Sequence, residues 1–364
     1  MERYPINLHE YEELAKKILP HNIWDYIEAG RGDEVTLRRN NEIFNEVFLR
    51  PNKMVDISTI KLQTTILGEK TSFPLMIAPA GGHTFCDEEG ELATIRAAKN
   101  EDVIAGVGTN SSFTIEDISN VTDKPLWFQI YHLTKEIDEM LIKRAEKSGY
   151  KVIVLTVDGP VPGMDHLRPK ERDIRNAFVN PVNTERVNLI GEIAGLGYKK
   201  GDKEVQLGGL NPGEQLLWED IEWFKSITNL PIVIKGLQSA HDAKKAVSCG
   251  VDGIVVSNHG ARGVDTLLPS LQSLPEVIEA VDGKCEVYLD GGIRRGADIL
   301  KALAFGAKGV MIGRPFYWGL AVGGENGVID VIKILKEELE QAMKYCGVTD
   351  VDNVDSNLLS YSFN

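Results

Sequence analysis

Residues 252–258 read DGIVVSN and the chain continues as 259-HGAR, so a short apolar run is followed at once by a histidine and an arginine. A β-branched run of this length, closed by polar residues, is typical of a strand that is buried on both faces of a parallel sheet. In barrels of parallel strands, the polar residues just past each strand carry the chemistry. This stretch therefore predicts a parallel architecture and the place of its active site.

Seven further runs of this kind occur along the chain, and amphipathic helical patterns lie between them. The predicted strands are residues 73–79, 103–109, 125–131, 151–158, 231–236, 252–258, 284–290 and 308–313. The predicted helices include residues 88–101, 134–149, 218–227, 241–250, 295–306 and 326–347. Eight strand–helix pairs close into a (β/α)₈ TIM barrel more readily than they form a doubly wound open sheet, so we predict the barrel.

The remaining residues fit around this barrel as parts of one α/β domain. We predict a single domain over residues 1–364, with an N-terminal helical lead over residues 1–70 and the barrel over residues 73–345. A long insertion, residues 159–215, follows the fourth strand. Loops of this length are uncommon unless they bind ligands or cover a site, so we expect a lid.

Composition excludes several classes of function. The 40 basic and 54 acidic residues give a net charge of −14, and no basic run offsets it, which disfavours nucleic acid as a partner. The four cysteines stand far apart without a CxxC pair, so we expect reduced thiols and no metal site. Residues 1–17 carry charges throughout and the chain ends in SFN rather than a peroxisomal address. We therefore expect a cytoplasmic protein with no membrane association.

The loops after the seventh and eighth predicted strands match the phosphate site of TIM barrels. Residues 290–295 read DGGIRR and residues 313–315 read GRP, and each loop leads into a helix. Backbone amides at such turns and helix starts bind phosphate groups, so these loops predict a phosphorylated ligand. The alternatives are that DGG is a plain tight turn and that Arg314 is a surface charge.

The sixth strand carries the most reactive group. His259 stands at the strand end, Arg262 follows three residues later, and Asp158 at the end of the fourth strand is within reach across the barrel mouth. A carboxylate beside an imidazole makes the ring a stronger proton acceptor, and a guanidinium grips a carboxylate. Tyr131 is placed to hydrogen-bond a hydroxyl, and Lys235 to stabilise negative charge on a cofactor, although a plain ion pair is its alternative. These residues predict a redox or proton-abstraction site.

The motifs 257-SNHGAR, QIY, TVD, IKG and DGGIRRG together closely resemble those of the FMN-dependent 2-hydroxy acid oxidase and dehydrogenase family, which includes glycolate oxidase and lactate oxidase. The resemblance extends over nearly the whole chain, from 24-WDYIEAGRGDEVTLRRN to 314-RPFYWGLAVGGENGV. It implies FMN as cofactor, a small L-2-hydroxy acid as substrate, and O₂ or another electron acceptor. It also implies a homotetramer.

Matched position by position, the resemblance assigns roles to individual residues. His259 is implied as the base, oriented by Asp158; whether it takes the α-proton or the hydroxyl proton stays open. Substrate contacts are implied for Tyr26, Tyr131 and Arg262, and Lys235 is implied to lie near the N1/O2 edge of the flavin. The residues implied to surround FMN are Pro79, Ala80, Gly81, Gly108, Gln129, Thr156, Lys235, Ser257, Asp290, Gly291, Gly292, Arg294, Gly313 and Arg314.

The chain departs from the family pattern in the lid and in the pocket. Lys170 stands where the family has a lid arginine, and Arg168 is a candidate substitute for it. Asn110 replaces a large aromatic residue, which predicts a roomier and more polar pocket.

Gly263 replaces the glutamine after the catalytic arginine, and Gly81 stands where most oxidases of the family have alanine. These two positions keep oxidase, dehydrogenase and lactate monooxygenase-like outcomes open. A larger α-hydroxy or α-amino substrate also stays open, as do a flavin protein without turnover and a flavin-dependent isomerase.

Overall fold

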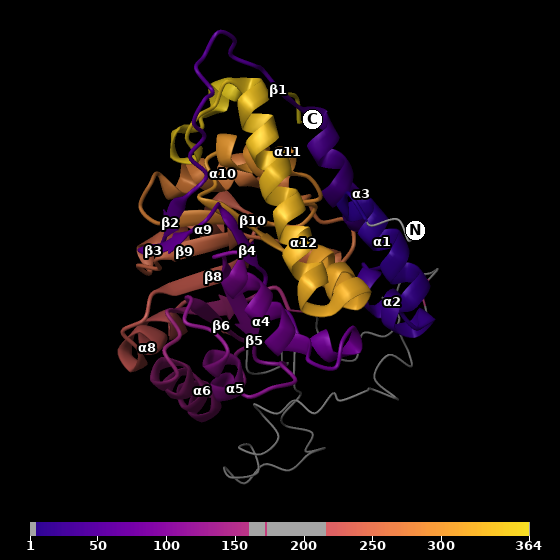
Figure 1. Ribbon diagram of the computed structural model, residues 1–364. Helices are drawn as coiled ribbons and strands as arrows, with labels where there is room; N and C mark the ends of the chain where they lie inside the picture. The colour runs from indigo at the N-terminus through magenta and orange to yellow at the C-terminus, as the bar shows by residue number, and fades with distance from the viewer. Residues whose placement is uncertain (1–4, 160–171, 173–215, 364) are drawn as a thin grey trace.

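Eight parallel strands close into a barrel in the computed structural model, which describes residues 5–159, 172 and 216–363 (Figure 1). The barrel strands are β4 (Leu75–Ile77), β5 (Ile104–Gly108), β6 (Leu126–Ile130), β7 (Val152–Thr156), β8 (Ile232–Leu237), β9 (Gly253–Val256), β10 (Glu286–Asp290) and β11 (Gly309–Ile312). Around the barrel the order is β10-β11-β4-β5-β6-β7-β8-β9, and every neighbouring pair is parallel. The predicted TIM barrel is confirmed.

Helices cover the outside of the barrel. They are α4 (Gly90–Asn100), α5 (Ile115–Asn120), α6 (Lys135–Lys147), α8 (Asp220–Ile227), α9 (Ala240–Ser248), α10 (Ser270–Val281), α11 (Gly296–Ala304) and α12 (Arg314–Cys346). Several begin at side-chain caps: Thr114, Thr134 and Ser239 each accept a hydrogen bond from a backbone amide of the first turn. These caps start the helices just past the strand ends and so fix the loops that line the mouth.

Side chains fill the inside of the barrel, which is a packed core and not a channel. The interior cluster includes Met76, Ile104, Trp127, Val152, Val154, Val233, Val255, Tyr288 and Met311. A hairpin of β2 (Thr64–Ile66) and β3 (Glu69–Thr71) adds Ile66 to this cluster. The amide of Leu67 donates to the carboxylate of Glu286, at the first residue of β10. The hairpin therefore closes the barrel at the end opposite the predicted site.

The N-terminal lead is helical over only part of its predicted length. Helices α1 (Leu8–Ile18), α2 (His21–Glu28) and α3 (Val35–Glu42) are followed by a short 3₁₀ helix, η1 (Ile43–Glu46). Beyond it come β1 (Val47–Leu49), β2 and β3, so the predicted helical lead over residues 1–70 is wrong after residue 46. The physical reason is local, because β-branched residues favour strands and a Leu67-Gly68 turn with positive φ at both residues joins β2 to β3.

Helix α12 ties the two ends of the chain together. It begins at Arg314, twelve residues before the predicted helix at 326–347, and bends at Gly323 and Gly324. Figure 1 shows it in yellow alongside the indigo helix α1, and Tyr11 of α1 donates a hydrogen bond to Asp330 of α12 at 3.1 Å. The C-terminal strand β12 (Leu359–Tyr361) then pairs with β1. These contacts hold the lead beside the mouth of the barrel.

Of the predicted lid insertion, residues 159–215, only Gly159 and Arg172 lie among the described residues. Within the described chain, no helix combines the length and apolar character needed to cross a membrane. Nor do three or more His, Cys, Asp or Glu side chains gather there in a way that would hold a metal ion.

Candidate active site at the carboxyl ends of the strands

The imidazole of His259 lies between a carboxylate and a phenol at the mouth of the barrel. Its Nδ1 is 2.8 Å from Oδ1 of Asp158, and its Nε2 is 3.2 Å from the hydroxyl of Tyr131. The backbone of His259 has a left-handed φ of 57°, and its amide donates to Ser257 Oγ at 2.9 Å. Such conformations persist where surrounding contacts enforce them, often at functional sites. The structure thus brings together three residues that are 101 and 128 positions apart in sequence.

The charge of Asp158 decides which nitrogen of His259 carries a proton. Burial alone would raise the pKa of Asp158, but the nearby Lys235 and His259 outweigh burial and lower this pKa to about 2. Asp158 is therefore a carboxylate at neutral pH and can only accept hydrogen bonds. The Nδ1 of His259 carries the hydrogen that Asp158 accepts, which leaves Nε2 of the neutral ring as the free base.

Lys235 forms an ion pair, which was the alternative to a role toward a cofactor. The ion pair lies inside the mouth of the barrel. Its Nζ lies 2.6 Å from Oδ2 of Asp290 and 2.8 Å from Oγ of Ser257. Burial lowers the pKa of Lys235, but the carboxylates of Asp290 and Asp158 outweigh burial, so the pKa is raised. Lys235 is a permanent cation between two acidic strand ends.

Several buried polar atoms have no hydrogen-bond partner among the residues that the structure describes, and they converge on the same mouth, where β6, β7 and β10 end. They are Nε2 of Gln129, Oγ1 of Thr156, Oδ2 of Asp158 and Oδ1 of Asp290. The amide of Thr109 donates to Oε1 of Gln129 at 3.3 Å, which leaves the amide nitrogen of Gln129 for another partner. Buried polar groups in proteins are nearly always paired, so this set indicates a bound polar molecule. Its mixture of donors and acceptors fits the polar edge of a flavin ring and the hydroxyls of its side chain.

The phosphate end of the site is built from glycines and a helix start. Gly291 and Gly292 have φ values of 91° and 86°, which side chains rarely adopt, and a Cβ on Gly292 would lie 1.9 Å from the carbonyl oxygen of Asn40. Gly313 precedes α12 and has no side chain that could cap the helix. Apart from its chain neighbours, no atom of the described residues lies within 4 Å of the position that a Cβ would take. At the start of α12 the amide of Arg314 is therefore available to an anion, whereas Pro315 has no N–H and the amide of Phe316 donates to the carbonyl oxygen of Gly313.

Guanidinium groups concentrate positive charge at this end of an acidic chain. Burial and the neighbouring Arg262, Arg294 and Arg172 lower the pKa of Arg314 to about 10, although Glu28 opposes them. The guanidinium of Arg314 itself donates to the carbonyl oxygens of Ile27, Ala29 and Gly260. Arginines that repel one another while buried favour a bound anion, which fits a phosphate group.

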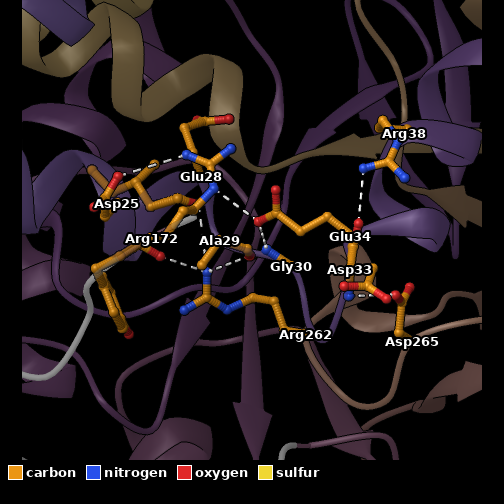
Figure 2. Close-up of polar contacts among 12 residues, drawn as sticks. Asp25, Glu28, Ala29, Gly30, Asp33, Glu34, Arg38, Arg172, Arg262 and Asp265 are labelled. Atoms are coloured by element: carbon orange, nitrogen blue, oxygen red, sulfur yellow. Dashed lines mark hydrogen bonds and ion pairs between the residues drawn. The ribbon is translucent and has the colours of Figure 1, made fainter. Parts of the chain in front are cut away.

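Arg262 is held by the end of helix α2 (Figure 2). Its Nη1 donates to the carbonyl oxygen of Tyr26 at 2.7 Å, and its guanidinium lies 4.7 Å from the centre of the Tyr26 ring. The same figure shows Arg172, a described residue of the insertion, and its Nε lies 2.8 Å from Oε1 of Glu34. Tyr26 and Arg262 thus lie together, as expected for two substrate contacts.

Four of the predicted FMN contacts lie at or just past the ends of strands β4 and β5. Pro79 and Ala80 follow β4, and Gly108 ends β5 beside them, since a Cβ on Gly108 would lie 3.4 Å from the carbonyl oxygen of Ala80. A Cβ on Gly81 would lie 2.7 Å from the carbonyl oxygen of Asn110. The predicted substrate contacts Lys170 and Arg168 lie outside the described residues.

The sequence did not single out three residues that the structure brings to the site. Thr109 orients Gln129, Tyr317 donates to the carbonyl oxygen of Gly81 at 2.6 Å, and Asp265 binds the lead beside Arg262. The position of Thr109 at a strand end is a usable signal. The contacts of the other two span more than 200 residues and leave no local pattern.

Comparison with known proteins agrees with this geometry. A family model described as FMN-dependent dehydrogenase matches residues 15–361. An L-lactate oxidase of Nostoc sp. is 44% identical over 98% of this chain and 98% of its own length. A peroxisomal (S)-2-hydroxy-acid oxidase of Oryza sativa subsp. japonica is 42% identical over 96% of this chain and 94% of its own length. The crystal structure of mandelate oxidase with (S)-2-phenylpropionate superposes with a TM-score of 0.87 at 34% identity, covering 99% of both chains. The chain therefore belongs to the family of FMN-dependent dehydrogenases, a family that here includes oxidases of lactate and other 2-hydroxy acids.

Proposed function

We propose that this chain oxidises an L-2-hydroxy acid to the 2-oxo acid, with FMN bound at the barrel mouth. The observation that carries the proposal is the hydrogen-bonded series from Asp158 through His259 to Tyr131. A charged acceptor on Nδ1 leaves Nε2 of His259 as a base that faces a hydroxyl group. The relatives named above support the substrate class, since their names specify lactate and (S)-2-hydroxy acids.

Each residue of the mouth has a separate part in this proposal. His259 takes a proton from the substrate at Nε2, and Asp158 stabilises the imidazolium that forms. Tyr131 gives up its hydrogen bond to Nε2 when substrate arrives and binds the substrate hydroxyl instead. Arg262 binds the carboxylate, and the Tyr26 ring against it limits where the guanidinium can move.

FMN, when bound, supplies the acceptor for the two electrons that leave the substrate carbon. The residues that would hold it include those whose buried polar atoms have no partner among the described residues: Gln129 and Thr156 would bind its ring, and Asp290 its hydroxylated side chain. Lys235 would offer a buried positive charge to the ring. The turn at Gly291 and the start of α12 would bind the phosphate. Substrate and solvent isotope effects on flavin reduction distinguish removal of the α-proton by His259 from removal of the hydroxyl proton.

The test is anaerobic mixing of the purified holoenzyme with candidate acids. L-lactate, glycolate and L-mandelate are each added, and the flavin absorbance near 450 nm is followed. We expect bleaching by at least one L-acid and by none of the D-enantiomers. If the protein binds FMN but no 2-hydroxy acid bleaches the flavin, this substrate class is excluded.

Asn110 favours a substrate with a polar side chain. Its Oδ1 is buried and has no hydrogen-bond partner among the described residues, and it lies beside Gly81. We infer that a group on the side chain of the substrate donates a hydrogen bond to Oδ1 of Asn110. L-glycerate and L-lactate differ by one hydroxyl and are the matched pair. Faster reduction by L-glycerate supports the inference, and faster reduction by L-lactate contradicts it.

We also propose O₂ as the electron acceptor, a homotetramer and a cytoplasmic location. Admitting air after anaerobic reduction separates the outcomes for the acceptor. Hydrogen peroxide with an intact 2-oxo acid indicates an oxidase, CO₂ release indicates monooxygenase-like chemistry, and a flavin that stays reduced indicates a dehydrogenase.

Four free cysteines support a reducing compartment. Light scattering tests the tetramer, and cell fractionation tests the location.

A further inference from the structure

Asp265 lies three residues after Arg262 and binds the start of helix α3 (Figure 2). Its carboxylate accepts hydrogen bonds from the backbone amides of Asp33 at 2.9 Å, Val35 at 3.2 Å and Thr36 at 2.9 Å. Burial alone would raise the pKa of Asp265, but these amides outweigh burial and lower the pKa. A charged carboxylate at a helix N-terminus is the favourable sign for the helix dipole.

The same two segments are also joined at Arg262 itself and at Leu267, beyond Asp265. The Nη1 of Arg262 binds the carbonyl oxygen of Tyr26, and the Nε of Arg31 donates to the carbonyl oxygen of Arg262 at 2.8 Å. The hydroxyl of Thr36 donates to the carbonyl oxygen of Leu267 at 3.0 Å. Bonds at Arg262, Asp265 and Leu267 therefore connect residues 26–36 with residues 262–267.

The close packing of Gly32 against Asp265 contrasts with the looser packing around Gly263. Gly32 has a φ of 54°, and a Cβ there would lie 3.0 Å from Cβ of Asp265, so the two backbones are in close contact. Gly263, next to Arg262, is different. Within the described part of the chain, a Cβ there would meet only the carbonyl oxygen of Asp158, at 3.7 Å. A glycine with no closer neighbour among these residues leaves the backbone beside Arg262 free to rotate unless the residues beyond it are fixed.

We propose that Asp265 is a positioning residue that fixes the guanidinium of Arg262 for the substrate carboxylate. It does so by anchoring the loop past Gly263 to the start of α3. The proposal rests on the proposed function, in which Arg262 binds that carboxylate. The simpler role, a helix cap that contributes only to stability, predicts a different set of changes, and the two can be separated.

The experiment compares Asp265→Asn with the wild-type holoenzyme in a binding assay that needs no turnover. Acetate and acetamide are titrated separately, and the change in the oxidised flavin spectrum gives each dissociation constant. Acetamide has the shape of acetate without its charge, so the ratio of the two constants isolates the contact with Arg262. The thermal unfolding midpoint is recorded for every variant. If Asp265→Asn does not fold, Asp265→Ser, which keeps a capping oxygen, replaces it.

We expect Asp265→Asn to weaken acetate binding about tenfold and to change acetamide binding less than twofold. Asn7→Ala is the matched control, because Asn7 caps α1 in the same lead by accepting a hydrogen bond from the amide of Glu10 and takes no part in the site. That variant should lower the unfolding midpoint without changing the acetate-to-acetamide ratio. An Asp265→Asn protein that behaves like Asn7→Ala would overturn the proposal.

Two further variants complete the design. Arg262→Gln should abolish the preference for acetate; if it does not, the carboxylate contact of the proposed function is wrong and the Asp265 proposal falls with it. If Arg262→Gln abolishes the preference while Asp265→Asn leaves it intact, only the Asp265 proposal is overturned. Gly263→Ala, added to Asp265→Asn, should restore part of the lost acetate affinity, because alanine restricts the backbone that Asp265 no longer holds. A double variant as weak as the single one would overturn the role of Gly263.

Discussion

Replacing Asp158 with asparagine removes the charge that directs the proton of His259. The side chain keeps its size, and its amide group can donate a hydrogen bond to Nδ1 where the carboxylate accepted one. The neutral imidazole would then carry its hydrogen on Nε2, the atom that must accept the substrate proton. The variant therefore changes the tautomer of the base while the rest of the site stays in place.

The structure sets a scale for the loss. Lys235 and His259 lower the pKa of Asp158 from 3.8 to about 2 against the effect of burial. A lowering of this size corresponds to about 2 kcal/mol of net stabilisation of the carboxylate by its surroundings, or roughly thirtyfold in rate if all of it acts in the transition state. The wrong tautomer adds to this, since the same change in an aspartate–histidine pair of a serine protease costs about 10⁴-fold. We expect flavin reduction to slow by about 10²–10⁴-fold.

Stopped-flow anaerobic reduction of the holoenzyme by L-lactate measures this step directly. Asp138→Asn is the matched control, because Asp138 also holds a histidine, with Oδ2 2.5 Å from Nδ1 of His132. That pair lies outside the reacting groups, so its variant should lose stability and keep the rate of reduction. A rate for Asp158→Asn within threefold of the wild type would refute the assignment of the base.

Three other predictions follow from buried contacts. Gln129→Ala should weaken FMN binding to the apoprotein about tenfold in a fluorescence titration, because one hydrogen bond to the ring is lost; unchanged affinity would contradict the fit of Gln129 to the flavin. Gly81→Ala places a Cβ 2.7 Å from the carbonyl oxygen of Asn110, so urea unfolding should show a loss of about 1–3 kcal/mol, and no loss would mean that the turn has room. Burial raises the pKa of Glu91 to about 7, above the ordinary 4.5, so its contribution to stability is complete below pH 4.5 and is lost as the pH rises through 7. Glu91→Gln should therefore match the wild type at pH 4.5 and exceed it by up to about 3 kcal/mol at pH 8, and an equal difference at both pH values would be evidence against the raised pKa.

The strands and their terminal residues could be predicted because their signals are local. Most residues of each barrel strand are apolar, as at residues 253–256, and the polar residues at the end of each strand must lie at the mouth whatever their partners are. That rule was sufficient to find His259 and Asp158. It also placed Lys235, but not the orientation that pairs it with Asp290.

The remaining features depend on contacts between distant segments. Asp265 binds amides some 230 positions away, and nothing around it distinguishes it from a surface aspartate. The strands after residue 46 were missed for another reason. They are three residues long, too short to show a period of two, and the helical pattern before them was extended too far.

The most direct test of the account is single-turnover reduction of bound flavin in His259→Asn, with an L-acid that bleaches the wild-type enzyme. Asparagine has no basic nitrogen, so we predict FMN bound at one equivalent per chain and a rate of reduction lower by at least 10³-fold. Reduction at the wild-type rate by this FMN-loaded variant would mean that the proton leaves the substrate without His259, and the assignment of His259 as the base would be wrong.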